Sequence, residues 1–293
     1  MSESIAPDSF DAVFSDLPRH CWDLSEIFGN ALYLSNCPAT RNLEDPADWL
    51  RIASGVRSVD LDTAAFDDTF MLCKSADDYF RRKDIVCSVT AKALTRFLYI
   101  WSAFETLVDS YWSERQIRKI GGKVKIASSV LKTQIRSHND FRGYTETLDA
   151  LHRIVKTENK YDKFLFAINN LKADEVPSAG LTLVYGLRNS FAHGSFKFPE
   201  PPDDVDEKTV HGLESIALID VSSRLALLSI QMLVWSLSPR SLEIEVPRRM
   251  RNLDADGTQQ PLGLLMQVVH LAAAPADDDE QEPFDFDPHL VPA

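Results

Sequence analysis

The sequence predicts a mainly α-helical fold: an antiparallel helical bundle with a small mixed α/β region before it and a short β-like extension after it. Two observations carry this prediction. Between residues 84 and 240, apolar side chains recur at steps of three and four, the spacing of a buried helix face. The run at residues 213–237 is apolar on nearly every side after Leu225. Such a helix lies at the centre of a bundle or is covered by a second subunit.

Residues 1–83 are expected to form an acidic accessory region of unknown role. Its apolar stretches are short, and we expect strands at residues 31–34, 56–61 and 69–73, separated by proline-containing turns. A helix is expected at residues 48–54. The aspartate pairs of this region match no cation-binding loop, so solvated turns are the expected structure around them.

The bundle is expected at residues 84–240. A long helix begins near Asp84, ends at Gly121-Gly122, and carries on one face Leu94, Leu98, Trp101, Glu105, Val108 and Trp112. A basic helix follows at residues 123–136. The next helix is expected to be capped by residues 137–140 and to bury Leu148, Leu151 and Val155. A further apolar set covers residues 164–172.

The second half of the bundle begins with a helix that starts at residues 176–178 and carries residues 185–193. Ser178 is its expected N-cap, and its buried side carries Leu183, Leu187 and Phe191. After the helix at 213–237, residues 242–246 alternate like an edge strand, and residues 264–271 are the expected partner within an extension at 241–274.

The tail, residues 275–293, is acidic and contains proline, so we expect it to be disordered. It includes Phe284-Asp-Phe-Asp287. This segment could dock on a regulatory protein partner or cover a basic surface of the same chain. A tail that only keeps the protein soluble is the simpler interpretation.

Cysteine usage and hydropathy favour a cytoplasmic protein. The four cysteines form no Cys-x-x-Cys pair, and no charged-then-apolar leader opens the sequence. The most apolar runs, at residues 225–237 and 262–274, are too short or too interrupted to cross a bilayer. We therefore expect a reducing compartment and no membrane segment.

The net charge of −13 argues against a nucleic-acid partner, but the charge is unevenly distributed. Residues 1–83 hold 8 basic and 15 acidic side chains, residues 84–240 hold 20 and 18, and residues 241–293 hold 3 and 11. Within the middle segment, residues 115–163 contain 12 basic and 5 acidic side chains. This cationic region could hold a phosphate backbone, although a solvated helix face would have the same composition.

The clearest candidate site lies at residues 185–194, Tyr-Gly-Leu-Arg-Asn-Ser-Phe-Ala-His-Gly. Cleaving a phosphodiester without a metal needs a group that moves protons near neutral pH, as His193 can. It also needs a cation for the growing charge on phosphate, as Arg188 can supply. Asn189 can orient either side chain.

The spacing of the three residues constrains how they could work together. In a helix, Asn189 and His193 share a face, whereas Arg188 points elsewhere. One copy of the chain therefore unites Arg188 and His193 only if the helix is distorted, unless a second copy completes the site. Gly194 is the expected helix C-cap, which places the imidazole at the negative helix end, where a proton donor is favoured.

Two segments resemble one known family. Arg188-Asn189, three residues, and then His193-Gly194 resemble the Arg-x4-6-His signature of HEPN (higher eukaryotes and prokaryotes nucleotide-binding) domains, in the version with a polar residue after the arginine. Residues 96–105, Arg-Phe-Leu-Tyr-Ile-Trp-Ser-Ala-Phe-Glu, resemble the long early helix of the Apea-like HEPN group. The resemblance covers about residues 84–240 and implies a HEPN-type bundle.

The resemblance also implies a metal-independent endoribonuclease whose products carry a 2′,3′-cyclic phosphate. Arg188, Asn189 and His193 are then catalytic, and Glu105, in the middle of an apolar stripe, faces Arg188 or His193 as a supporting residue. A structural ion pair with a nearby arginine is the alternative for Glu105. HEPN domains commonly form homodimers with a composite active site and often serve as toxins or in anti-phage defence. No zinc, magnesium, nucleotide or flavin motif is present, so we expect neither cofactor nor metal.

Two other functions are compatible with the sequence. One is a non-catalytic HEPN module that binds RNA, a nucleotide or a protein as a sensor or scaffold, which the overall acidity favours and the intact Arg188, Asn189 and His193 oppose. The other is a helical adaptor in which the motif is accidental. The adaptor predicts that the motif side chains do not converge.

Overall fold

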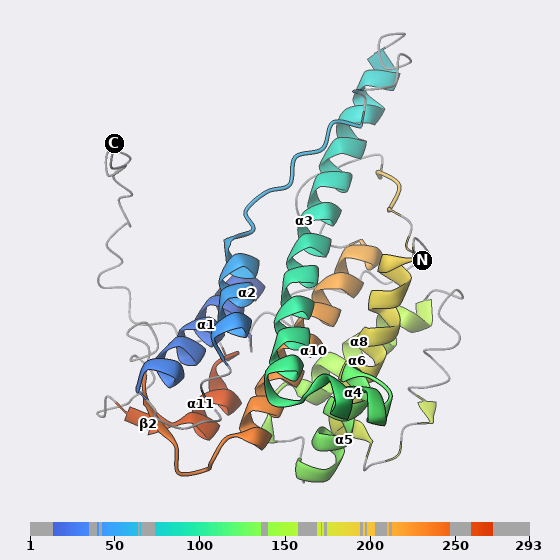
Figure 1. Cartoon of the computed structure of the whole chain (residues 1–293). Coiled ribbons are helices and arrows are strands. Elements are labelled where there is room, and N and C mark those ends of the chain that lie inside the picture. The colour runs from blue at the N-terminus through green and yellow to red at the C-terminus, as the bar shows by residue number, and fades with distance from the viewer. Residues whose placement is uncertain are drawn as a thin grey trace, which may run out of the picture.

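The protein is mainly helical, which confirms the predicted fold class. The computed structural model describes residues 14–34, 40, 43–63, 65, 74–135, 140–157, 169–170, 172, 175–193, 196, 198–202, 210, 213–246 and 259–271. Figure 1 shows the helices packed as a bundle around α10 (Glu214–Leu237), with the long α3 (Lys74–Tyr111) crossing it. Buried side chains from both ends of the described chain join one hydrophobic core.

α10 is the central helix of the bundle. Every residue from Ser222 to Val234 is buried, because helices pack on it from several sides. This confirms the prediction of a long helix at residues 213–237 and shows that a single chain already covers it. By length and composition α10 is the one helix in the described part of the chain that could cross a membrane, and most of it is buried as in a core helix.

The N-terminal region is helical where the structure describes it, and the predicted strand at residues 31–34 is wrong. Those residues end α1 (Leu17–Leu34), whose Cys21, Leu24, Phe28 and Ala31 recur at helical spacing and are fully buried. The helix predicted at residues 48–54 is confirmed within α2 (Glu44–Gly55). The strand predicted at residues 69–73 lies outside the described residues.

Residues 56–61, also predicted as a strand, form no strand and instead lie against a helix. The segment is non-helical, and the Leu61 N–H donates to Ser88 Oγ of α3 at 3.2 Å. The Thr63 N–H likewise donates to an Asp84 carboxylate oxygen at 2.7 Å. The segment therefore runs along α3, as Figure 1 shows, and side chains of α3 satisfy these two backbone N–H groups.

α3 joins the two regions that the sequence separated at residue 84. It begins at Lys74, so that boundary falls inside a continuous helix. At 38 residues α3 is about 57 Å long. Its C-terminal half packs in the core, and its N-terminal end extends beyond the bundle in Figure 1. α1 and α2 pack beside it and belong to the same core as the predicted HEPN-like domain.

The long helix ends before Gly121, which corrects its predicted end. α3 stops at Tyr111, and α4 (Glu114–Ile120) begins with a capping box in which Ser113 and Gln116 satisfy each other's backbone N–H. Gly121 then ends α4 with a φ of 96°, a conformation that favours glycine. α5 (Lys123–Gln134) follows as predicted.

The next helices agree with the sequence in their buried faces and differ at their caps: the cap predicted at residues 137–140, of which the structure describes only residue 140, lies before the next helix starts at Tyr144. α6 (Tyr144–Thr157) buries the predicted Leu148, Leu151 and Val155. α8 (Val176–Ala192) buries Leu183 and Leu187, but Ser178 lies buried inside its first turn and is not the N-cap. The helix starts earlier because Pro177 fits the first turn, where no helical N–H is needed. The helical set predicted at residues 164–172 lies largely outside the described residues.

The C-terminal extension contains the predicted strand with a different partner. β1 (Glu243–Glu245) pairs antiparallel with β2 (Gln259–Pro261). The predicted partner, residues 264–271, is mostly the helix α11 (Leu262–Val268), whose Leu262, Leu265 and Met266 are buried against the bundle. The tail at residues 275–293, with its predicted disorder, lies outside the described residues.

A buried polar network fastens this extension to the core. His20 of α1, Gln231 of α10 and His270 after α11 are all fully buried. Gln231 joins the two histidines, and its side-chain amide also donates to the carbonyl of Met266. The network therefore links segments from both ends of the described chain through the central helix.

The hydrogen bonds of this network are consistent with one proton arrangement. Arg224 only donates, so the 3.2 Å contact from its Nη1 makes His20 Nδ1 an acceptor. His20 Nε2–H then donates to Gln231 Oε1 at 2.7 Å, and Gln231 Nε2 donates to His270 Nδ1 at 3.0 Å. His270 Nε2–H donates to the Arg142 carbonyl at 2.7 Å. Both imidazoles are therefore neutral.

Candidate functional site

The C-terminal end of α8 carries the three motif residues. Leu183 and Leu187 bury one face of the helix, and this orientation leaves the Arg188 and Asn189 side chains partly exposed in the last turn. His193 is the C-cap residue, and its backbone N–H donates to the Asn189 carbonyl at 2.9 Å. Gly194, the predicted cap, lies outside the described residues.

An aromatic chain holds this end of the helix. Phe191 packs edge-on against Phe97 of α3, with ring centroids 5.3 Å apart, and against Phe196, with centroids 5.1 Å apart. The Phe196 N–H also donates to the Ser190 carbonyl at 3.2 Å. The Phe191 ring is therefore packed between two other rings, and this packing fixes the helix end that carries the motif. Catalytic side chains need such a fixed support.

Arg188 lies beside Asn189 and keeps most of its donors uncommitted. Its Nη1 is 3.5 Å from Asn189 Oδ1, at the outer limit of a hydrogen bond. Its Nε is buried and has no hydrogen-bond partner in the described part of the chain. A buried guanidinium donor without an acceptor is costly.

His193 is exposed, and its imidazole makes no hydrogen bond, ion pair or ring contact with another described side chain. The Asn189 amide oxygen faces Arg188, so it does not orient the imidazole as the shared helix face suggested. Five residues of helix separate Arg188 from His193, which corresponds to about 140° around the axis. One chain therefore places the two groups at the same helix end but on different sides of it.

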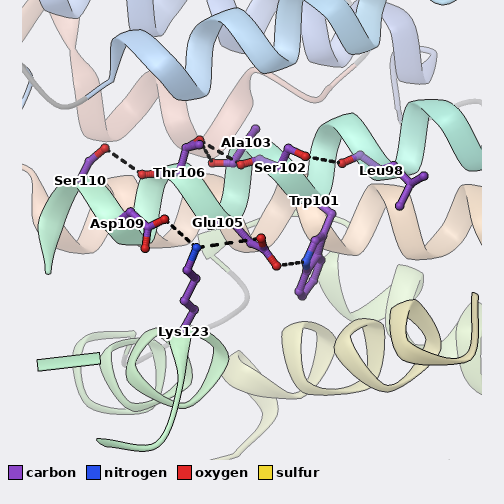
Figure 2. A network of polar contacts seen from close by, with 9 residues as sticks. All are labelled: Leu98, Trp101, Ser102, Ala103, Glu105, Thr106, Asp109, Ser110 and Lys123. Atoms are coloured by element: carbon purple, nitrogen blue, oxygen red, sulfur yellow. Dashed lines mark hydrogen bonds and ion pairs between the residues drawn. The ribbon is translucent and has the colours of Figure 1, made fainter. Parts of the chain in front are cut away.

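Glu105 is committed to a different network, shown in Figure 2. Its Oε1 accepts the indole N–H of Trp101 at 2.7 Å, and its Oε2 is 3.9 Å from Lys123 Nζ at the start of α5. Lys123 also forms a 2.6 Å ion pair with Asp109. The Glu105 side chain is 39% exposed, so it is less costly to keep charged than its place in an apolar stripe suggested.

The packing register explains why Glu105 does not reach the motif. Phe97 packs on Phe191, and Trp101 stacks on Tyr185, so α3 and α8 run antiparallel at this contact. Moving along α3 toward Glu105 therefore means moving along α8 away from His193. Within one chain, the expectation that Glu105 faces Arg188 or His193 is corrected: its partners are Trp101 and Lys123.

Glu105 instead lines a groove of about 1050 Å³ between α3, α5 and α8. Trp101 and Tyr185 form its aromatic side, and Lys123, Lys125 and Lys132 lie along it. None of the three motif residues lines this groove. The sequence placed Lys123 and Lys125 in a cationic region and Tyr185 at the start of the motif stretch, but their common groove could not be predicted because it depends on how α5 packs on α8.

Comparisons with protein-family models, with curated proteins and with solved structures gave no match for this chain. The HEPN resemblance of the motif therefore remains a prediction. In the described residues, no group of three or more histidine, cysteine, aspartate or glutamate side chains could hold a metal ion. Cys21 and Cys87 are buried thiols, and burial raises the pKa of Cys21 to about 12.

Proposed function

We propose that the protein is an endoribonuclease of HEPN type that needs no metal and has its catalytic residues at the end of α8. The observation that carries the proposal is the presence at one rigid helix end of an exposed imidazole, His193, and a guanidinium with a buried donor that no described group accepts, Arg188. A proton-transferring group and an uncommitted cation are the two parts that phosphodiester cleavage requires.

In the proposed reaction, the ribose 2′-hydroxyl attacks the adjacent phosphorus and the bond from phosphorus to the 5′-oxygen breaks. The proton lost by the 2′-hydroxyl goes to a general base, and the departing 5′-oxygen receives one from a general acid. His193 performs one of these transfers, and Arg188 stabilises the charge on the phosphorane. The products are a 2′,3′-cyclic phosphate and a 5′-hydroxyl. Asn189, beside Arg188, positions the guanidinium.

We further propose that two copies of the chain form the active unit. The angle between Arg188 and His193 around α8 keeps them apart within one copy, and a facing helix end from a second copy would bring one of each together. A homodimer with a composite site uses both residues without distorting the helix. A role as a toxin or in anti-phage defence is proposed on the HEPN resemblance alone.

The test of the nuclease is cleavage of a mixed tRNA and mRNA pool in EDTA. His193→Ala should lower the rate by about 10²–10⁴-fold, the usual contribution of a general acid or base. His152→Ala, which changes a partly buried histidine of α6 away from the motif, should cleave like the wild type. End-group analysis should find cyclic phosphates. Equal cleavage by the wild type and His193→Ala would refute the catalytic assignment.

The test of the composite site mixes two inactive variants, His193→Ala and Arg188→Ala. A mixed dimer has one intact site, made of Arg188 from one copy and His193 from the other. Since half the dimers in an equal mixture are mixed and each has one working site of two, about a quarter of the wild-type rate should return. A mixture as inactive as its components would show that both residues act from the same copy.

One observation favours a second function, a HEPN module that binds RNA or a nucleotide without cutting it. Glu105 is held by Trp101 and Lys123, so among the described residues of one chain His193 has no carboxylate partner. The groove that Glu105 lines is a binding surface separate from the motif. A wild-type protein that binds RNA and leaves it intact under every condition above would establish this second function.

A further inference from the structure

The groove between α3, α5 and α8 has the dimensions of a ligand site. Its volume of about 1050 Å³ is at the upper end of the range for small-molecule pockets. It is built on three helices of the bundle and on the Gly121-Gly122 turn. Sites built on helices are positioned more precisely than sites built on loops.

One wall of the groove is an aromatic platform. The rings of Trp101 and Tyr185 are stacked, with centroids 6.1 Å apart and planes 20° apart. Trp101 is 3% exposed and fixed by its hydrogen bond to Glu105, whereas Tyr185 is 43% exposed. Tyr185 is therefore supported on its inner side and accessible from the groove, as an aromatic ring that stacks on a nucleobase must be.

A second wall of the groove is cationic. Lys123, Lys125 and Lys132 line the groove with the carboxylates of Glu105 and Glu175, which leaves a net charge of +1 within a chain whose net charge is −13. Lys132 is paired with Glu175 at 3.0 Å. Lys125 has no ion pair with a described residue, and its chain lies over Gly121. It is the lysine most available to a ligand.

The start of α5 adds backbone donors to the same wall. Its N-cap, Gly122, has no side chain to accept the first-turn N–H groups, and the first turn contains no acidic residue. It contains Lys123 and Lys125 instead. Cations at the positive end of a helix repel it, and a bound anion would relieve that repulsion and accept the N–H groups.

We propose that this groove binds a nucleotide unit, with the base stacked on Tyr185 and the phosphate held by Lys125, Lys123 and the first turn of α5. The hydroxyls of Ser128, Ser129 and Thr182, which also line the groove, are available to the ribose or the base edge. Figure 2 shows how Glu105 ties Trp101 and Lys123 into one framework from α3. The aromatic and cationic walls are thereby held at a fixed separation.

The nucleotide unit can belong to a free nucleotide or to a single-stranded RNA. Tyr185 lies eight residues before His193 on α8, which is about 12 Å along the axis, a few nucleotides at the ~3.4 Å spacing of stacked bases. A strand anchored on Tyr185 can therefore extend toward the motif. The assignment of an RNA strand rests on the proposed function, whereas stacking and phosphate binding do not.

The test measures binding without cleavage. The probe is a fluorescent single-stranded RNA ten nucleotides long, bound to the full chain with His193→Ala in EDTA and followed by anisotropy at several salt concentrations. Adding Tyr185→Ala should weaken binding about tenfold or more, and Tyr185→Phe, which keeps the ring, should restore it. Lys125→Gln should weaken binding and lower the slope of log K against log salt by about one charge.

Lys119→Gln is the matched control, because Lys119 is an exposed lysine of neighbouring α4 outside the groove. It should bind like the parent. Competition with AMP shows which molecule supplies the nucleotide unit. Displacement of the probe by millimolar AMP supports a free nucleotide as the ligand. RNA binding that AMP does not displace supports a single-stranded RNA. Binding that is unchanged by Tyr185→Ala and equal in Lys125→Gln and Lys119→Gln would overturn the proposal. Cleavage assays on the same wild-type protein decide the nuclease separately.

Discussion

Replacing Gln231 by methionine should lower the free energy of unfolding, because it removes the hydrogen bonds that hold the C-terminal extension to the core. Methionine has nearly the same volume, so little cavity forms and the change isolates the hydrogen bonds. Three buried groups lose their partner: the N–H of His20, the acceptor nitrogen of His270 and the carbonyl of Met266. Each orphaned group costs about 1–3 kcal/mol, so we expect about 3–5 kcal/mol in total after partial re-pairing.

Urea unfolding followed by circular dichroism measures this loss. A loss of this size is a substantial fraction of the ~5–15 kcal/mol that stabilises a typical domain, so the midpoint should move far outside experimental error. Gln134→Met is the control, because Gln134 is an exposed residue of α5 whose side chain makes no hydrogen bond with a described residue. A Gln231→Met protein within about 1 kcal/mol of this control would refute the account of the network.

Further predictions concern how stability depends on pH and how it changes when either of two glycines is replaced by alanine. Burial lowers the pKa of His270 from 6.5 to about 4 and that of His20 well below 6.5. The unfolded chain therefore binds more protons below pH 6.5, and urea titrations should show stability falling as pH drops from 6.5 toward 4, by about 3 kcal/mol for His270 alone. Gly180→Ala should lower the melting temperature, because a Cβ there would lie 2.9 Å from the Tyr144 hydroxyl that binds the Gly180 N–H. Gly29→Ala should raise it by the equivalent of about 0.5–1 kcal/mol, since its Cβ meets only the end of a flexible arginine.

Sequence periodicity predicted the helices of the bundle because their buried faces repeat over several turns. The short runs were less informative. Residues 31–34 are apolar and too few to show a period, so a strand was as compatible with them as the end of α1. The break before α4 carried a visible signal, the Ser113-x-x-Gln116 capping box, which outweighed the more conspicuous glycine pair at 121 and 122.

Only those features of the site that involve residues close together in the sequence could be predicted. The placing of Arg188, Asn189 and His193 at one helix end follows from spacing along α8. The Trp101–Glu105 hydrogen bond is also local, because the two residues are four apart on α3. The contact of Glu105 with Lys123 could not be predicted, because it depends on where α5 begins, and the distance of Glu105 from the motif depends on the antiparallel register of α3 with α8. The His20–Gln231–His270 network was out of reach for the same reason, since its hydrogen bonds join residues as much as 211 positions apart.

The central position of α10 also constrains the order in which the chain can fold. Helices α1, α3, α5, α6 and α8 precede it in the sequence, yet each of them packs against this segment, which ends at Leu237. Until that segment has been synthesised, the earlier helices have only each other to pack on and leave apolar surface exposed. Most of the bundle must therefore close late in synthesis or after it, and a chain cut short before α10 is expected to aggregate.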